Sequence, residues 1–160
     1  MQLARHTLLL LVAFVLQTTW AHVFEILDLR PDLILLALVY IALRAGPFPA
    51  TLLGFGIGLF QDAYMPQNLG LNALVKSIAG FAVGYGRTGI MADSAQVQAL
   101  LTFGVVLIHD LLYYLAYSGI GIADVPFFWL RYGLGRAIYT GLLSFLLSYA
   151  WTLRRRLSPA

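Results

Sequence analysis

Long apolar runs separated by short polar breaks dominate this chain of 160 residues. The runs are continuously apolar and lack the strict in–out alternation that a transmembrane strand requires, so the pattern predicts helices. We place six helices, at residues 7–23, 33–43, 48–60, 71–85, 97–117 and 132–153. The first, fifth and sixth are long enough to cross a bilayer at about 1.5 Å of rise per residue.

The second and third helices are short, and only the stretch from Arg44 to Pro47 separates them. Either both cross the membrane with their polar ends in the headgroup region, or they form a re-entrant hairpin. The hairpin would hold Arg44 at membrane depth without water, at a cost of about 2.5–3.5 kcal/mol or more. We therefore prefer two short crossings. Both alternatives return the chain to the same side at Asp62, so the rest of the topology is unaffected.

The composition and the placement of charges make lipid the expected surroundings. Hydrophobic residues make up 61% of the chain and charged residues 11%, which is more apolar surface than one soluble core can enclose. Basic residues occupy every second break: Arg5, Arg44, Arg87 and the run Arg154, Arg155, Arg156. Acidic residues occupy the alternate breaks: Glu25, Asp28, Asp32, Asp62 and Asp124. By the positive-inside rule, the sequence predicts an all-α, multi-pass membrane protein with both termini in the cytoplasm.

No linker, repeat or low-complexity tract divides the sequence, so we expect one transmembrane domain over residues 1–160. A cleaved signal peptide is an alternative for the N-terminus, since Arg5 and His6 precede an apolar run and Ala21 has suitable spacing. The run continues through Trp20 and is long enough to span, so we prefer a retained first helix. The net charge of +3 is spread over several loops, which argues against a nucleic-acid-binding face.

Four ionisable residues lie within the apolar segments or at their edges, namely Asp62, Lys76, Asp110 and Arg136. The predicted topology places all of them in the outer third of the bilayer. Small or hydroxylated residues recur on the helix faces of Asp62, Lys76 and Arg136, as they do at close helix contacts in lipid. With Asn72 and His109 nearby, we expect these side chains to meet in a buried network. The preferred pairs are Asp110–Arg136 and Asp62–Lys76.

Two functions remain open for this network. It can fix how the helices pack, as buried ionic groups do in some proteins, and this is the interpretation that we prefer. It can also form a proton or substrate pathway, because intramembrane ionisable residues often mark one and His109 lies beside Asp110.

Other motifs point to packing rather than to catalysis. Gly54 and Gly58, and likewise Gly80 and Gly84, have the small-xxx-small spacing that brings helix backbones together in lipid. The chain has no cysteine, no G-x-S-x-G elbow and no His or Glu cluster at metal-ligand spacing. We therefore expect no metal, no organic cofactor and no enzymatic activity.

The segment 118–129 is predicted as a loop, because Gly119, Gly121 and Pro126 break the helical pattern. It ends in an apolar group made of Phe127, Phe128 and Trp129. This group is either an anchor in the membrane interface or an extracytoplasmic docking surface, since aromatic residues are enriched in both.

A longer pattern runs through the first half of the chain. It begins at Arg30-Pro-Asp-Leu-Ile-Leu-Leu, passes through Arg44-Ala-Gly-Pro and Gly54-Phe-Gly-Ile-Gly-Leu-Phe-Gln-Asp62, and ends at Asn68-Leu-Gly-Leu-Asn-Ala-Leu74. In these elements the chain resembles the MreD family of bacterial rod shape-determining proteins. The second half matches by hydropathy and length alone. Asp62 is the one charged position that the resemblance assigns to the family motif.

The resemblance implies a non-enzymatic scaffold of the cell-wall elongation machinery in the bacterial inner membrane, which helps to control peptidoglycan synthesis and rod cell shape. Its implied partner is MreC, and through MreC the MreB filament, the RodA glycosyltransferase and its penicillin-binding transpeptidase. The implied helix arrangement is similar to the S components of energy-coupling factor transporters. An alternative function is therefore a solute- or lipid-binding transport component, with an outward-facing pocket near Asp62, Asn72, Lys76 and Arg136.

Overall fold

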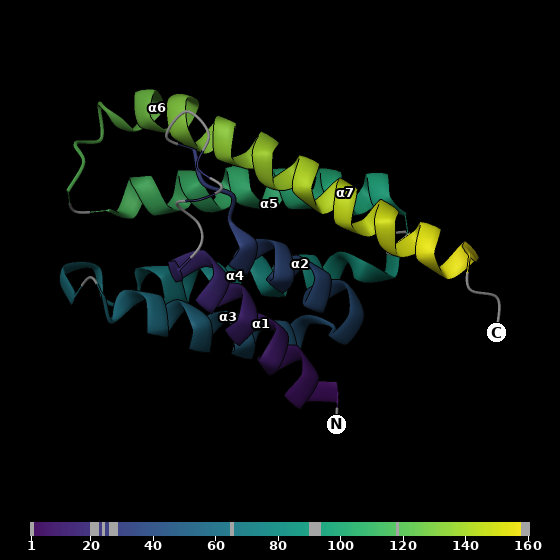
Figure 1. Cartoon of the computed structure of the whole chain (residues 1–160). Helices are drawn as coiled ribbons and strands as arrows, with labels where there is room; N and C mark the ends of the chain where they lie inside the picture. The colour runs from purple at the N-terminus through teal and green to yellow at the C-terminus, as the bar shows by residue number, and fades with distance from the viewer. Residues whose placement is uncertain are drawn as a thin grey trace.

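The computed structural model describes residues 2–19, 23, 25, 29–64, 66–89, 94–117 and 119–157. For residues 155–157 it describes the backbone alone. These residues form an all-α bundle (Figure 1). Its helices are α1 (Gln2–Thr19), α2 (Leu33–Ala45), α3 (Pro47–Asp62), α4 (Leu71–Gly86), α5 (Ala95–Ala116), α6 (Val125–Phe128) and α7 (Leu134–Leu157). Short 3-10 turns at Pro66–Asn68 and Arg87–Gly89 and a π-helical turn at Trp129–Gly133 complete the described helical structure.

The six predicted helices correspond in order to α1–α5 and to one continuous helical stretch made of α6, the π-helical turn and α7, and the largest differences are at the two ends of the chain. The first helix begins at Gln2 rather than at residue 7, and it ends at Thr19. Of the predicted remainder, residues 20–22 lie outside the described residues and Val23 lies in a turn. The last helix was predicted to begin at residue 132, but continuous helical structure already begins at Val125.

The turns between consecutive helices alternate between the two ends of the bundle. In Figure 1 the N- and C-termini lie toward the end at which α2 turns into α3. The turn after α4 lies at this end too, because Arg87 Nη1 donates a hydrogen bond to the Arg44 carbonyl oxygen at 3.2 Å. Gly46, with a φ of 92°, allows the tight turn there and leaves room for the Arg87 guanidinium. The two arginines therefore share one end of the fold.

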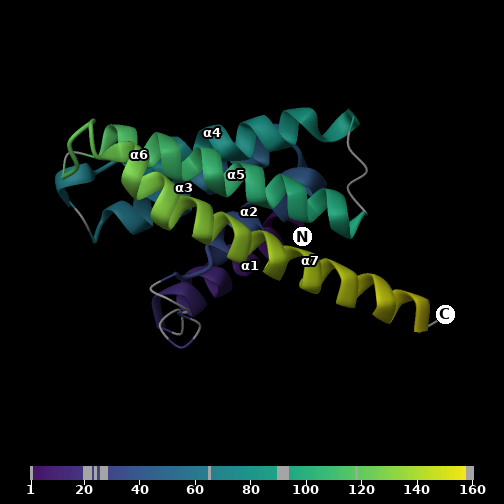
Figure 2. The ribbon, with the colours of Figure 1, turned by 90° about the horizontal axis from the view of Figure 1, so that it is seen from above.

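Helix α2 is the centre of the core. It contacts α1, α3, α4, α5 and α7, and its Ile34, Leu35 and Ile41 are fully enclosed. A helix that is apolar on all sides is typical of a buried core or of a membrane span, and in this bundle α2 is enclosed by other helices. Leu10 of α1 and Val106 of α5 pack into the same cluster. The remaining helices therefore take their places around α2 (Figure 2).

The outer surface of the bundle is unusually apolar for a chain of this size. Large hydrophobic side chains protrude from most of the helices, with 78% of Phe48, 63% of Phe60 and 72% of Leu100 exposed. Monomeric soluble proteins rarely expose apolar surface this widely. Among the described helices, α5 alone is long and apolar enough to cross a membrane by length and composition, and α2 is apolar but shorter.

The predicted small-residue contacts lie between α3 and α4, which pack with their backbones almost touching. A methyl group added at Gly58 would lie 2.5 Å from the Cα atom of Ala73. At Gly54 it would lie 2.6 Å from the Lys76 carbonyl oxygen. Gly80 and Gly84 approach the backbone of α3 as closely. The four glycines thus make α3 and α4 into one closely packed hairpin.

We expect Gly58→Ala to destabilise the protein by about 1–3 kcal/mol, because the added methyl group forces α3 and α4 apart. Gly56 is the matched control, since a methyl group there meets no atom within 4 Å. Gly56→Ala should stabilise the helix by about 0.5–1 kcal/mol. Denaturant-induced unfolding in detergent micelles, followed by far-UV circular dichroism, measures both. Equal effects of the two variants would contradict this packing.

Candidate functional site: the buried polar network

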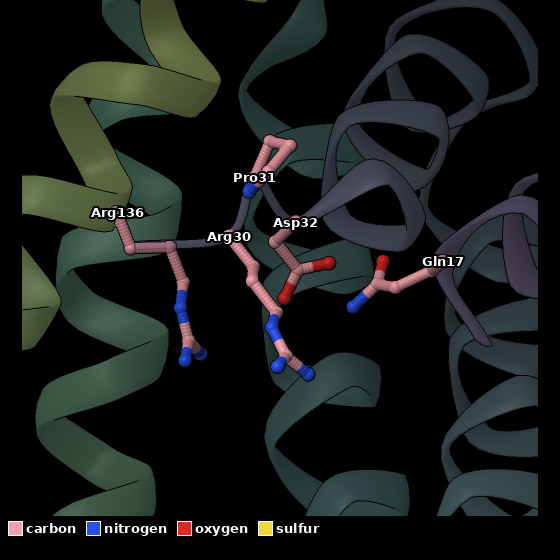
Figure 3. A pocket seen from close by; sticks show the side chains of 5 residues that line it. All are labelled: Gln17, Arg30, Pro31, Asp32 and Arg136. Atoms are coloured by element: carbon pink, nitrogen blue, oxygen red, sulfur yellow. The ribbon is translucent and has the colours of Figure 1, made fainter. Parts of the chain in front are cut away.

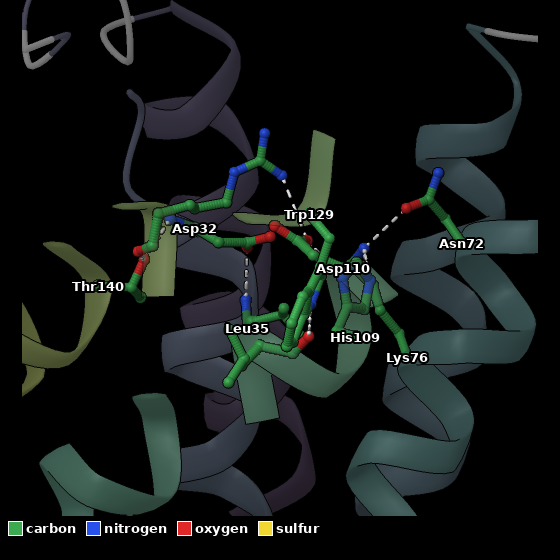
Figure 4. Close-up of polar contacts among 10 residues, drawn as sticks. Asp32, Leu35, Asn72, Lys76, His109, Asp110, Trp129 and Thr140 are labelled. Atoms are coloured by element: carbon green, nitrogen blue, oxygen red, sulfur yellow. Dashed lines mark hydrogen bonds and ion pairs between the residues drawn. The ribbon is translucent and has the colours of Figure 1, made fainter. Parts of the chain in front are cut away.

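Asp110 on α5 joins the network to α7. Its side chain is 2% exposed, and its Oδ1 accepts hydrogen bonds from His109 Nδ1 at 3.1 Å and from Arg136 Nη1 at 3.4 Å (Figure 4). The predicted Asp110–Arg136 pair is therefore present. The other carboxylate oxygen, Oδ2, is buried and has no hydrogen-bond partner within the described part of the chain.

Lys76 on α4 is almost completely enclosed, with 1% of its surface exposed. Its ammonium group donates to Asn72 Oδ1 at 2.9 Å and lies 3.2 Å from His109 Nε2. A lysine ammonium only donates, so His109 accepts at Nε2 and carries its proton on Nδ1, from which it donates to Asp110. The geometry therefore fits a neutral histidine between a cation and a carboxylate.

Asp62, at the end of α3, does not pair directly with Lys76, and that part of the prediction is wrong. Its carboxylate accepts four hydrogen bonds at 3.0–3.1 Å, from the backbone amides of Gly70, Asn72 and Ala73 and from Asn72 Nδ2. The first amides of a helix lack hydrogen-bond acceptors within the helix, and for α4 the Asp62 carboxylate is that acceptor. Asn72 bridges the two charges, since its amide donates to Asp62 and its oxygen accepts from Lys76.

Asp32 is a member of the network that the sequence analysis left among the loop residues. It is 4% exposed, and its Oδ1 caps α2 by accepting from the Leu35 amide at 2.8 Å. Its own amide donates to Thr140 Oγ1 on α7 at 3.0 Å. An aspartate directly before an apolar run is a signature of a helix N-cap, and this signal could have revealed the residue.

Around His109, the carboxylates of Asp32 and Asp110 oppose the cations of Lys76 and Arg136. Asp62, which Asn72 joins to Lys76, lies at the N-terminus of α4, where the helix dipole favours a negative charge. The hydrogen-bonded chain from Asn72 to Arg136 links α4, α5 and α7, and this arrangement suits a fixed packing device.

The hydroxyl residues that follow Arg136 along α7 continue this contact. Thr140 accepts the hydrogen bond from the Asp32 amide described above and donates to the Arg136 carbonyl oxygen at 2.8 Å. The hydroxyl groups of Thr102 on α5 and Ser144 on α7 are hydrogen-bonded at 3.1 Å, and Ser148 donates to Gln98 Oε1. Polar contacts thus run along the length of the α5–α7 interface.

A cavity of about 170 Å³ lies beside the network. It is lined by Gln17, Arg30, Pro31, Asp32 and Arg136 (Figure 3). Of the residues expected around a pocket, Arg136 lines the cavity; Asp62, Asn72 and Lys76 do not. The reason is that these three residues bond to one another or to the start of α4, on the far side of His109 and Asp110.

The aromatic group at 127–129 is helical rather than a loop. Pro126 lies in the first turn of α6, where the amide N–H that proline lacks would have no partner within the helix. Trp129 Nε1 donates to the Leu107 carbonyl oxygen of α5 at 2.9 Å. Phe128 stacks on Tyr132 with ring centroids 6.1 Å apart. Phe127 is 58% exposed, so of the three it is the most accessible to a partner or to lipid.

Among the described residues, no group of three or more His, Cys, Asp or Glu side chains is placed to hold a metal ion. A protein-family model described as rod shape-determining protein MreD matches residues 1–151. No curated protein and no solved structure matches the chain.

Proposed function

Because the chain belongs to the MreD family and therefore has a role in rod shape determination, we propose that it is a non-enzymatic membrane scaffold of the cell-wall elongation machinery. In this proposal residues 1–160 form a single domain of six membrane-crossing helices. Both termini are cytoplasmic, and the helix arrangement is that of the S components of energy-coupling factor transporters. The location is the bacterial inner membrane.

The apolar exterior and the placement of charge support this topology. Exposed side chains such as Phe48 and Leu100 would contact lipid instead of water. Arg44, in the last turn of α2, and Arg87, directly after α4, meet at one end of the bundle, as basic residues at the cytoplasmic ends of helices in a multi-pass protein do. Helices α2 and α3 contain 13 and 16 residues, so their polar ends would lie in the headgroup region.

The observation that carries the scaffold proposal is what the family motif does in the fold. Gly54 and Gly58 bring α3 against α4, and Asp62 caps α4. These three residues are thus used in building one closely packed hairpin, whereas Arg30, Pro31 and Asp32, at the start of the same pattern, line the cavity. A motif used in this way is expected of a protein that presents a fixed surface to its partners.

We place MreC as the direct partner, and MreB, RodA and the penicillin-binding transpeptidase as indirect ones. Phe127 is a candidate contact for MreC, because it is exposed on a segment that Trp129 fixes to α5. The alternative function, a solute- or lipid-binding transport component, is favoured by one observation, the cavity beside Arg136.

Affinity purification of the tagged protein from solubilised membranes separates the two functions. The scaffold predicts that MreC is the main co-purifying protein and that depletion turns rods into round cells. A chain carrying Gly58→Ala should no longer co-purify with MreC or maintain rod shape, whereas a chain carrying Gly56→Ala should do both. Recovery of an ATPase module in place of MreC would support the transporter and contradict the scaffold.

A further inference from the structure

The cavity between α1, α2 and α7 contains more hydrogen-bond donors than its surroundings use. Arg136 donates one hydrogen bond, from Nη1 to Asp110, and its Nε and Nη2 donate to no described residue. Arg30 donates from Nε and Nη2 to the Glu25 carboxylate, at 2.9 and 2.7 Å, so its Nη1 can donate to a ligand. Figure 3 shows both guanidinium groups extending in the same direction beside the Asp32 carboxylate.

Gln17 of α1 adds a third donor on the opposite wall. Its Oε1 accepts from the Ile34 amide at 3.0 Å, which fixes the side chain and leaves the Nε2 group without a partner among the described residues. Two guanidinium groups and one amide suit a ligand that accepts several hydrogen bonds, and phosphate is the group that arginine binds best in this way.

Asp32 gives the cavity an acceptor as well. One of its oxygens is used by the Leu35 amide, and the carboxylate forms part of the cavity wall. The Asp32 carboxylate weakens the binding of any anion here, and a hydroxyl group on the ligand offsets this effect, because it can donate to Asp32 while the arginines hold the phosphate. The lining therefore suits a phosphate ester with a hydroxyl-bearing substituent.

The size of the cavity limits what can enter. Pockets for drug-sized molecules have volumes of about 300–1,000 Å³, whereas this cavity has about 170 Å³. Asp32 and Pro31 lie at the start of α2, at the end of the bundle opposite to the Arg44–Arg87 contact. In the topology proposed above this is the extracytoplasmic end, at the depth of lipid headgroups.

We propose that this cavity is a binding site for the phosphate headgroup of a membrane lipid in the outer leaflet. Arg136 and Arg30 contact the phosphate, Gln17 donates to it, and Asp32 accepts from a headgroup hydroxyl. The position relative to the leaflet depends on the proposed topology, but the chemistry of recognition does not. The scaffold and this site can fail independently, because the assay below contains no partner protein.

Native mass spectrometry of the full-length protein, purified in detergent and supplied with phosphatidylglycerol, measures the binding. We expect the wild type to retain one lipid and Arg30→Gln to bind roughly tenfold more weakly, since one charge-assisted contact to the phosphate is lost. Arg131→Gln is the matched control, because Arg131 is exposed near the same end and does not line the cavity. It should bind as the wild type does.

Two further arms identify the source of the phosphate. Diacylglycerol lacks the phosphate and should not be retained. Inorganic phosphate should compete only weakly; displacement of the lipid at comparable concentrations would assign the site to free phosphate instead and overturn the proposal. The proposal is also overturned if the wild type retains no lipid, or if Arg30→Gln and Arg131→Gln bind equally well. If Arg30→Gln fails to fold, Arg30→Lys replaces it, since lysine keeps the charge but loses the planar fork.

Discussion

Replacing Asp62 with alanine is expected to destabilise the protein by about 3 kcal/mol, because buried backbone amides lose their acceptor. Three of the four hydrogen bonds to this carboxylate come from the backbone at the start of α4. Asp62 is fully buried, so water cannot replace the lost carboxylate without entering the α3–α4 interface. The first turn of α4 should open, and Lys76, which follows on the same helix, should then lose its fixed position. Unfolding in mixed detergent micelles, followed by far-UV circular dichroism, gives the change in free energy.

Two further variants make the Asp62 prediction specific. Asp62→Asn keeps one oxygen acceptor but turns an N–H group toward two donors, so about half of the loss is expected. Asp124 is the control: it is exposed, and its side chain makes no capping bond to α6. Asp124→Ala should change stability by less than about 0.5 kcal/mol. If Asp62→Ala were as mild as Asp124→Ala, the capping role would have to be given up.

The helices could be predicted from the sequence because long apolar runs alternate with short polar breaks, and some of these breaks contain residues that begin or end a helix. Asp32 caps the first turn of α2, and Gly46 ends that helix with a positive φ. The start of the last helical stretch was missed because Pro126 was treated as a helix breaker. Proline breaks a helix in its interior, but at the first turn its fixed φ is compatible with the helix. Position within the element decides the effect, and composition alone does not give the position.

The candidate site was partly predictable for a related reason. Depth along the helices brings Asp110 and Arg136 together, because two oppositely charged side chains buried at one level have few other partners. The same argument fails for Asp62 and Lys76, because it ignores the backbone amides at the start of α4. Asp32 was missed because it was treated as a loop charge. Only the packing of α2 against α7 reveals that it is buried.

Replacing Lys76 with methionine should have the largest effect, a loss of about 3–5 kcal/mol. Methionine fills a similar volume, so the expected loss arises from charge and not from a cavity. Without the ammonium group, the carboxylates of Asp32 and Asp110 face the single guanidinium of Arg136 in an enclosed site. His109 also loses the donor to its Nε2. The same unfolding measurement in micelles reports the change.

The double variant Lys76→Met with Asp110→Asn tests whether the network acts as one balanced unit. It removes one charge of each sign, so Asp32 and Arg136 remain as an equal pair. We expect the double variant to be about 1–2 kcal/mol more stable than the sum of the two single effects predicts. Arg131→Met, at an exposed position, should change stability by less than about 0.5 kcal/mol and controls for the loss of a cation. Strictly additive single effects would mean that charge balance does not hold α4, α5 and α7 together.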